Sequence, residues 1–299
     1  MTEDASLRAR AVGAVVLGRD LLTQAVSGGP LSAALGGAWG VWRALQTGLG
    51  GAAATDLDAY GRDAGLARDL QPLGAFLYER YFRVRVEGAE NIPAGPVILV
   101  ANHSGALPID GPVLHAALMR ERPDLLDARW LVEDQVYLAP FLGTLLNRLG
   151  AVRACPENAL RLLGEGRPVI VFPEGLQGIG KPWKERYRLM RFGRGGFVKI
   201  ALRTGAPIVP VAIVGAEESM PLLGRLPGGP LGLPYVPLTS PVPLPARWII
   251  RFGQPLRVDG HDPAAHEDIA LVHRLNERTR ESVQGMLDAI LNAREGVFA

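Results

Sequence analysis

Residues 97–111 read VILVANHSGALPIDG, and this stretch decides the fold class of the chain. It opens with a short, continuous apolar run, which is typical of a strand buried inside a parallel sheet. His103 follows that strand almost at once, and Asp110 comes seven residues later. Open α/β sheets place their sites at the carboxyl ends of strands, and a histidine beside a carboxylate can act as a general base. The structural alternative is a loop histidine that closes the strand, with an aspartate that caps the next helix.

A second strand end carries an acidic residue. Residues 168–175 read PVIVFPEG, so a buried strand runs directly into a Pro-Glu-Gly turn. Glu174 at such a strand end can bind a polyol, pair with a cation or hold a loop in place. Because the glycine and proline of the first loop can fold it back on itself, we expect His103 and Asp110 to meet close to Glu174.

Strands and helices alternate along the rest of the chain. Strands are expected at residues 83–88, 97–101, 129–132, 169–172, 208–214 and 248–252. Helices are expected at residues 63–81, 112–119, 139–149, 157–163 and 195–204, and after the Asp262-Pro263 pair. This alternation predicts an α/β fold with a mostly parallel sheet flanked by helices. We place the α/β domain at residues 81–260, between an N-terminal helical region at 1–80 and a C-terminal helix at 261–299.

The composition excludes several classes of protein. The 299 residues carry a formal net charge of +2, which gives no support for a nucleic-acid-binding protein with a dense basic surface. The hydrophobic fraction of 48% excludes wholesale disorder. The single cysteine, Cys155, excludes an intramolecular disulfide framework and any cysteine-based zinc site. No metal-ligand spacing such as His-Glu-x-x-His occurs, so we predict neither a metal ion nor a nucleic-acid partner.

The N-terminal region is apolar but interrupted. From Leu21 to Trp42 there are 22 uncharged residues, which is nominally enough to cross a bilayer. The sequence SGGP at residues 27–30 lies within this stretch, so we expect two Ala/Gly-rich helices that break there. An interfacial or hairpin membrane anchor is the favoured interpretation. A true membrane span, and helices packed on the protein's own core, are the alternatives.

Residues 221–245 are rich in proline and leucine and carry Arg225 as their one charge. Proline at this density prevents a regular helix or a central strand, so we expect a long apolar loop. Such a loop is usually functional in a compact domain. It either crosses the surface tucked onto the core, or it lies against lipid or lines a site for an acyl chain.

Basic residues concentrate between Lys181 and Arg203, where eight lysines and arginines are opposed by Glu185 alone. Aromatic residues interleave with them, a pattern that suits anionic lipid headgroups or the phosphates of CoA. A solvated basic face is the alternative.

Residues 175–181 also satisfy the Gly-x-x-x-x-Gly-Lys pattern, but Pro182 stands where a nucleotide-binding loop needs Ser or Thr. Nucleotide hydrolysis is therefore not expected.

Four sequence blocks occur in an order that resembles the glycerolipid acyltransferase family, which includes the lysophosphatidate acyltransferases. The blocks are Asn102-His103 with Asp110, Gly150-Ala151-Val152-Arg153, Phe172-Pro173-Glu174-Gly175 and Pro207-Ile208-Val209-Pro210. The resemblance extends over residues 83–253. It implies the α/β fold of that family and the activity of an O-acyltransferase.

The resemblance implies a role for each of these residues. His103 would take the proton of an acceptor hydroxyl, and Asp110 would orient the imidazole and stabilise its charged form. The activated oxygen would then attack the thioester of acyl-CoA or of an acyl carrier protein, without an acyl-enzyme and without a cofactor. Glu174 and Gly175 would help to bind the acceptor, and Arg153 would contact a phosphate of the acceptor or of the donor.

Six residues separate His103 from Asp110, whereas the common family spacing is His-x-x-x-x-Asp. The Gly-Ala-Leu-Pro-Ile-Asp ending of this loop is closer to the monoacylglycerol- and diacylglycerol-acyltransferase-like branch, so the acceptor is either of the lysophosphatidate type or a neutral mono- or diacylglycerol. Lys181, which opens the basic run, is assigned to substrate binding.

We therefore predict a membrane-associated acyltransferase of glycerolipid and phospholipid synthesis, peripheral or monotopic at the cytoplasmic face of the cell membrane. A lipid hydrolase or thioesterase that uses the same His–Asp pair, and a non-catalytic lipid-binding protein, are the alternatives.

Overall fold

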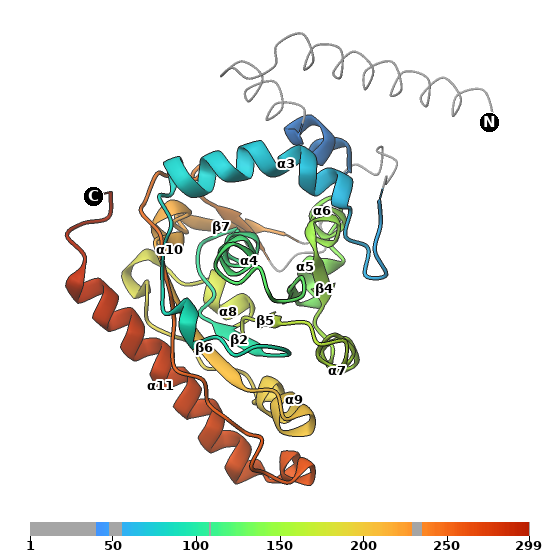
Figure 1. The fold of residues 1–299 in the computed structure, drawn as a ribbon. Coiled ribbons are helices and arrows are strands. Elements are labelled where there is room, and N and C mark those ends of the chain that lie inside the picture. Colours follow the sequence, from blue (N-terminus) through green and yellow to red (C-terminus); the bar gives the residue numbers. More distant parts are fainter. Residues whose placement is uncertain (1–39, 48–55, 108, 229–234, 299) are drawn as a thin grey trace.

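A mostly parallel β-sheet with helices on both faces forms the framework of the chain (Figure 1). The computed structural model describes residues 40–47, 56–107, 109–228 and 235–298. Residues 40–47 are helical, and α3 (Ala64–Phe76) continues directly into a π-helical turn, η1 (Leu77–Tyr81). The helix predicted at residues 63–81 is thereby confirmed.

The main sheet within the described residues has seven strands in the order β1-β9-β6-β2-β5-β3-β4. Their bounds are β1 Arg85–Glu87, β2 Ile98–Ala101, β3 Arg129–Val132, β4 Ala151–Arg153, β5 Val169–Val171, β6 Ile208–Val214 and β9 Ile249–Phe252. The strands from β6 to β4 in this order are parallel. β9 pairs antiparallel with β6 and carries β1 as a parallel neighbour. The predicted mostly parallel sheet with flanking helices is therefore confirmed.

Two hydrophobic layers cover the faces of the sheet. One layer contains α7 (Pro156–Gly164), α9 (Gly196–Thr204) and α11 (Ile269–Ala293), and the other contains α4 (Asp110–Glu121), α6 (Leu142–Leu149) and η1. Figure 1 shows α11 along the outer side of the first layer, on the opposite side of the sheet from α3. The remaining helical segments are short: η2 (Ala89–Asn91), α5 (Asp134–Tyr137), α8 (Leu176–Ile179), η3 (Trp183–Glu185), α10 (Ala216–Ser219) and η5 (Pro263–Glu267).

Full burial explains why the central strands read as unbroken apolar runs. Every residue of β2 and of β6 is buried. Ile98 and Val100 belong to the layer with α9 and α11, while Leu99 and Ala101 belong to the layer with α4. Because both faces of the sheet are covered, both sides of each central strand need apolar residues.

Two segments differ from the expectation. The sequence predicts no strand at β4, because Ala151 and Val152 are its only apolar residues and give neither a continuous apolar run nor an alternation. The loop predicted at residues 221–245 contains two short strands, β7 (Gly224–Pro227) and β8 (Tyr235–Leu238), which pair antiparallel in a sheet of their own. Proline keeps this hairpin out of the main sheet, since it cannot donate to a central ladder.

The C-terminal helix is confirmed but begins later than the Asp262-Pro263 pair predicts. Asp262 caps the 3-10 turn η5 with its side chain. α11 begins at Ile269, after Asp268 has accepted a hydrogen bond from the Leu271 N–H at 3.0 Å. Ile269 itself is exposed, so the buried stripe of α11 starts further along the helix.

The predicted membrane-associating stretch at residues 21–42 lies almost wholly outside the described residues. Its last part, residues 40–42, belongs to the helix at 40–47. In the part of the chain that the structure describes, no helix combines the length and the hydropathy that crossing a membrane requires.

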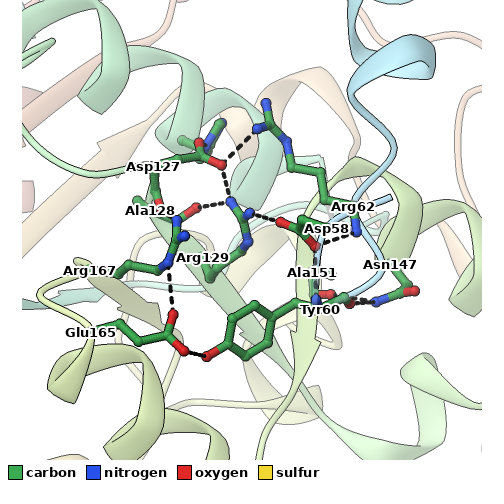
Figure 2. A network of polar contacts seen from close by, with 11 residues as sticks. Asp58, Tyr60, Arg62, Asp127, Ala128, Arg129, Asn147, Ala151, Glu165 and Arg167 are labelled. Atoms are coloured by element: carbon green, nitrogen blue, oxygen red, sulfur yellow. Dashed lines mark hydrogen bonds and ion pairs between the residues drawn. The ribbon is translucent and has the colours of Figure 1, made fainter. Parts of the chain in front are cut away.

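A network of charged side chains holds the segment before α3 against the start of β3 (Figure 2). The Arg129 side chain is 2% exposed and forms ion pairs with Asp58 and Asp127. Arg62 also reaches Asp127, with 2.7 Å between Nη1 and Oδ2. Burial by itself raises the pKa of Asp127, but hydrogen bonds from His115 and Arg129 outweigh burial and hold that pKa well below the usual carboxyl range. These paired charges fix the entry of the chain into α3.

Arg129→Met is expected to lower the free energy of unfolding by about 2 kcal/mol, because it removes the buried cation that donates to Asp58 and Asp127, while Asp127 keeps its contacts with Arg62 and His115. Equilibrium unfolding in urea measures the change. Arg68→Met is the matched control, since the side chains of the Arg68–Asp56 pair are 71% and 56% exposed. Exposed pairs contribute at most about 1 kcal/mol. Equal losses in the two variants would contradict the anchoring role of Arg129.

Candidate active site

The Asn102 side chain joins the end of β2 to β6 through two hydrogen bonds. Asn102 is fully buried, its Nδ2 donates to the Ile213 carbonyl oxygen at 3.0 Å, and its Oδ1 accepts from the Ile213 N–H at 2.7 Å. These bonds satisfy the backbone of β6 at the point where β2 ends. The chain therefore leaves the sheet in a defined direction, and His103 is the next residue.

His103 and Asp110 form a close pair at this edge of the sheet. His103 Nδ1 lies 2.6 Å from Asp110 Oδ2, and the Asp110 side chain is 1% exposed. The Ser104 N–H donates to the same oxygen at 2.9 Å, and the Gly111 N–H donates to Oδ1 at 2.9 Å. Asp110 is the first residue of α4, where the helix dipole also favours a carboxylate. With Nδ1 bonded to the carboxylate, Nε2 is the ring nitrogen that remains to accept a proton.

Gly105 makes the longer loop compatible with this pair. Its φ of 85° lies in the left-handed region that glycine adopts without strain. A Cβ at this position would approach the Ala216 carbonyl oxygen to 3.0 Å, so the loop packs closely on α10. The Ala106 N–H donates to the Met220 carbonyl oxygen at 2.8 Å. The expected meeting of the histidine and aspartate side chains is thereby confirmed, although Pro108 lies outside the described residues.

The surroundings of His103 increase its basicity. Phe172 stacks on the imidazole, with 4.6 Å between the ring centroids and 26° between the planes. Burial by itself lowers the pKa of His103, and the nearby Lys181 lowers it too. The adjacent Asp110 carboxylate and the charge of Glu174 outweigh both effects, so the pKa lies above the ordinary histidine value.

A pocket with a cavity volume of about 40 Å³ lies beside this pair and opens to the surface. The His103 pocket, as we call it, is lined by His103, Asp110, Gly111, Trp130, Leu131, Val132, Glu133, Val136, Phe172, Gly175, Leu176 and Ile179. Most of these side chains are apolar, and Glu133 adds one carboxylate to the His–Asp pair. Apolar walls with a few convergent polar groups are typical of a site for a small or lipidic ligand.

Glu174 is buried next to the pocket and joins three parts of the site. Its Oε1 accepts from the His103 N–H at 2.9 Å, and its Oε2 accepts from the Met190 N–H at 2.7 Å. Lys181 Nζ lies 3.3 Å from the same Oε2. The carboxylate thus supports the backbone of His103, and the residue does not belong to the lining of the His103 pocket.

Lys181 is a buried counter-ion. Its side chain is 1% exposed and lies between Glu174 and Glu217, with 3.2 Å from Nζ to Glu217 Oε1. Burial raises the pKa of Glu217, and Lys181 and the Tyr187 N–H offset this effect in part. The assignment of Lys181 to substrate binding stays a prediction, and the structure places its ammonium group inside the protein.

Gly175 brings the chain close to the pocket wall. Its φ of 55° and ψ of −145° define a backbone conformation that residues other than glycine rarely adopt. A Cβ at this position would overlap the Glu133 carboxylate. The absence of a side chain at Gly175 therefore leaves room for the Glu133 carboxylate, beside the residue to which the sequence assigns acceptor binding.

Arg153 lies at the end of β4 and outside the lining of the His103 pocket. Its Nε and Nη2 each lie 2.7 Å from an oxygen of Asp134. The two side chains are 52% and 48% exposed. The guanidinium is thus at the same edge of the sheet as His103 but is already paired, and its contact with a phosphate stays a prediction.

Sequence reasoning missed two acidic residues of the site, Glu133 and Glu217. Glu133 directly follows β3, and Glu217 comes three residues after the end of β6. Both obey the rule that led to His103 and Glu174, since parallel strands deliver the residues that follow them to one edge of the sheet.

Among the described residues, no group of three or more His, Cys, Asp or Glu side chains is arranged to hold a metal ion.

Lys181→Met is expected to lower the free energy of unfolding by about 3 kcal/mol or more, because it leaves Glu174 and Glu217 buried without their shared cation. Urea unfolding measures the loss. Lys184→Met is the control, since Lys184 is exposed and a surface change of this kind stays within about 0.5 kcal/mol. A Lys181→Met protein that keeps its stability and loses affinity for substrate would show instead that the ammonium group binds substrate directly.

Comparison with known proteins identifies the family of the chain. The acyltransferase family matches residues 83–214. An uncharacterised protein of Mycobacterium tuberculosis is 42% identical over 241 residues, which cover 77% of this chain and 67% of that protein. A 1-acyl-sn-glycerol-3-phosphate acyltransferase of Chlamydomonas reinhardtii is 27% identical over 153 residues, which cover 47% of this chain and 41% of that protein.

A solved structure shares the fold. The crystal structure of the 1-acyl-sn-glycerophosphate acyltransferase PlsC from Thermotoga maritima is similar, with a TM-score of 0.50 over 77% of this chain and 83% of that chain. At 21% identity, this likeness concerns the fold alone. Taken together, the matched family, the relatives and the fold show that the chain is an acyltransferase and belongs to the glycerolipid acyltransferase family.

Proposed function

We propose that the protein transfers a fatty acyl group from acyl-CoA or an acyl carrier protein to a glycerolipid hydroxyl, with His103 as the general base. The observation that carries this proposal is the 2.6 Å contact between His103 Nδ1 and the buried Asp110 Oδ2, beside a mostly apolar pocket. The acceptor is of the lysophosphatidate type or is a neutral mono- or diacylglycerol.

The proposed reaction needs no covalent enzyme intermediate. Nε2 of His103 removes the proton of the acceptor hydroxyl as the oxygen attacks the thioester carbonyl, and Asp110 stabilises the imidazolium that forms. The tetrahedral intermediate then expels the thiolate, and His103 returns the proton to the sulfur. One ester bond forms and one thioester bond breaks.

Glu174 acts by positioning in this proposal. It accepts a hydrogen bond from the His103 backbone N–H at 2.9 Å, and both of its carboxylate oxygens already have partners within the protein. The acceptor is bound instead at the pocket wall, where Gly175 makes room for the Glu133 carboxylate and the exposed Glu133 can accept hydrogen bonds from hydroxyl groups. In this proposal the apolar side chains of the pocket contact the part of the acyl chain next to the thioester.

We further propose that the enzyme binds peripherally to the cytoplasmic face of the cell membrane. The β7–β8 hairpin and its flanks expose Leu223, Leu226, Leu238 and Val242. Arg225 of this hairpin donates to the Gly180 carbonyl oxygen and lies 4.8 Å from the centroid of the Tyr235 ring. Because Gly180 ends α8, which lines the His103 pocket, lipid held by the hairpin would lie close to that pocket.

Flotation of the protein with liposomes tests this attachment. Binding that persists after a high-salt wash supports insertion of the apolar side chains. Binding that salt removes completely is electrostatic and would argue against such insertion.

The acyl-transfer function is tested with the full chain in liposomes, labelled acyl-CoA, and lysophosphatidate, monoacylglycerol or diacylglycerol as acceptor. We expect transfer to at least one acceptor, and His103→Ala is expected to lower the rate by about 10²–10⁴-fold, as loss of a general base does. His273→Ala on the exposed side of α11 is the control. Free fatty acid and CoA released without acceptor would indicate a thioesterase, and no transfer at all would refute the proposal.

The rate of transfer is expected to rise with pH, because a general base must be neutral. Since the pKa of His103 is raised, the midpoint of kcat/KM lies above the ordinary histidine value of about 6.5. Asp110→Asn removes the charge that raises this pKa and leaves the burial that lowers it, so the midpoint moves to lower pH while the maximal rate falls. The exposed Asp124→Asn is the control. An unchanged midpoint in Asp110→Asn would contradict the assignment.

A further inference from the structure

A second hollow adjoins the His103 pocket. It has a cavity volume of about 410 Å³, and Glu133 and Leu176 line both this hollow and the His103 pocket. Gln177, Arg191 and Arg194 line it elsewhere, and we call it the arginine hollow. A substrate with its reacting end in the His103 pocket can therefore extend into the arginine hollow with its other end.

Arg191 and Arg194 have no partner among the described residues. Both side chains are exposed, and neither forms a hydrogen bond or an ion pair with another described residue. Other basic residues of the same run are engaged elsewhere: Lys181 is buried between two carboxylates, and Arg186 lies 4.4 Å from the centroid of the Trp183 ring. The basic run predicted from the sequence therefore does not form one uniform face, and two of its cations line the hollow.

The loop that carries the two arginines is anchored to the site. The Met190 N–H, directly before Arg191, donates to Glu174 Oε2 at 2.7 Å. Phe192, directly after Arg191, is fully buried, and its carbonyl oxygen accepts from Asn276 Nδ2 at 2.9 Å. These contacts hold the backbone in place, while the guanidinium groups remain available to a ligand.

Two acidic residues, Glu133 and Glu174, also line the hollow. The Glu174 side chain is 0% exposed and pairs with Lys181, whose Nζ lies 3.3 Å from Oε2, so its charge is neutralised inside the protein. Glu133 lies at the boundary with the His103 pocket. The negative charge of Glu133 thus lies next to the His103 pocket, and the positive charges of Arg191 and Arg194 lie in the arginine hollow. This separation of charge favours a ligand whose anionic end lies in the hollow, away from His103.

We infer that Arg191 and Arg194 bind a phosphate group of one of the two substrates, an inference that rests on the proposed acyl transfer. The planar donors of a guanidinium group match the oxygens of a phosphate in geometry as well as in charge. The phosphate belongs either to the acyl donor, as in CoA or the prosthetic arm of a carrier protein, or to a lysophosphatidate acceptor.

Kinetics distinguish these two sources. Arg191→Gln and Arg194→Gln are compared with Arg188→Gln, an exposed arginine of the same run that does not line the hollow. Acyl-CoA and a phosphate-free N-acetylcysteamine thioester are each tested as donor with lysophosphatidate and with monoacylglycerol. We expect KM for the phosphate-bearing substrate to rise about tenfold in each hollow variant, the loss of one charge-assisted hydrogen bond. Arg188→Gln is expected to match the parent.

The pattern of KM values decides the inference. An increase confined to acyl-CoA assigns the hollow to the donor phosphate, and an increase confined to lysophosphatidate assigns it to the acceptor phosphate. No increase with any pair overturns the inference. An equal increase with the pair that lacks phosphate altogether, the N-acetylcysteamine thioester with monoacylglycerol, overturns it as well.

Binding without reaction separates this inference from the proposed function. The parent and the double variant are titrated with CoA and with glycerol 3-phosphate. Weaker binding of either ligand by the double variant supports the phosphate site, even if the parent transfers no acyl group. Binding that is unchanged, or absent already in the parent, overturns the phosphate site and leaves the proposed acyl transfer to be judged by its own assay.

Discussion

The buried carboxylate of Glu174 is the interaction on which the arrangement of the site depends. It accepts hydrogen bonds from the His103 N–H and the Met190 N–H and pairs with Lys181. It therefore ties the loop after β2, the loop after β5 and the loop that leads to α9 to a single point. Burial of the carboxylate removes its hydration, which is unfavourable. The ion pair with Lys181 and the two N–H donors offset this loss of hydration.

The order of the strands makes this convergence possible. β2 lies between β6 and β5, and the three strands are parallel. The residues that follow them, which include His103, Glu174 and Glu217, therefore emerge at one edge of the sheet although they are far apart in the sequence. Lys181 then lies between the two glutamates, so a single cation serves two strand ends.

The two edges of the sheet use charge differently. At the start of β3, Arg129 is buried and paired with Asp58 and Asp127, and these pairs anchor the chain that enters α3. At the opposite edge, Arg191 and Arg194 line a hollow without a partner among the described residues. The pairs of Arg129 hold the chain that enters α3, whereas Arg191 and Arg194 remain open to a ligand on the side where the sheet presents its pocket.

The sequence by itself determined the class of sheet, the strand ends and the residues that follow them, because unbroken apolar runs and local turn residues are visible without neighbours. It could not show β4, which has only two apolar residues, or the β7–β8 hairpin, because the prolines within both of its strands argue against a strand. Only the tertiary structure decided which members of the basic run are buried and which are free. Lys181 is enclosed because the chain that follows β6 places Glu217 beside it. Such burial depends on contacts between residues far apart in the sequence, so a local sequence pattern cannot predict it.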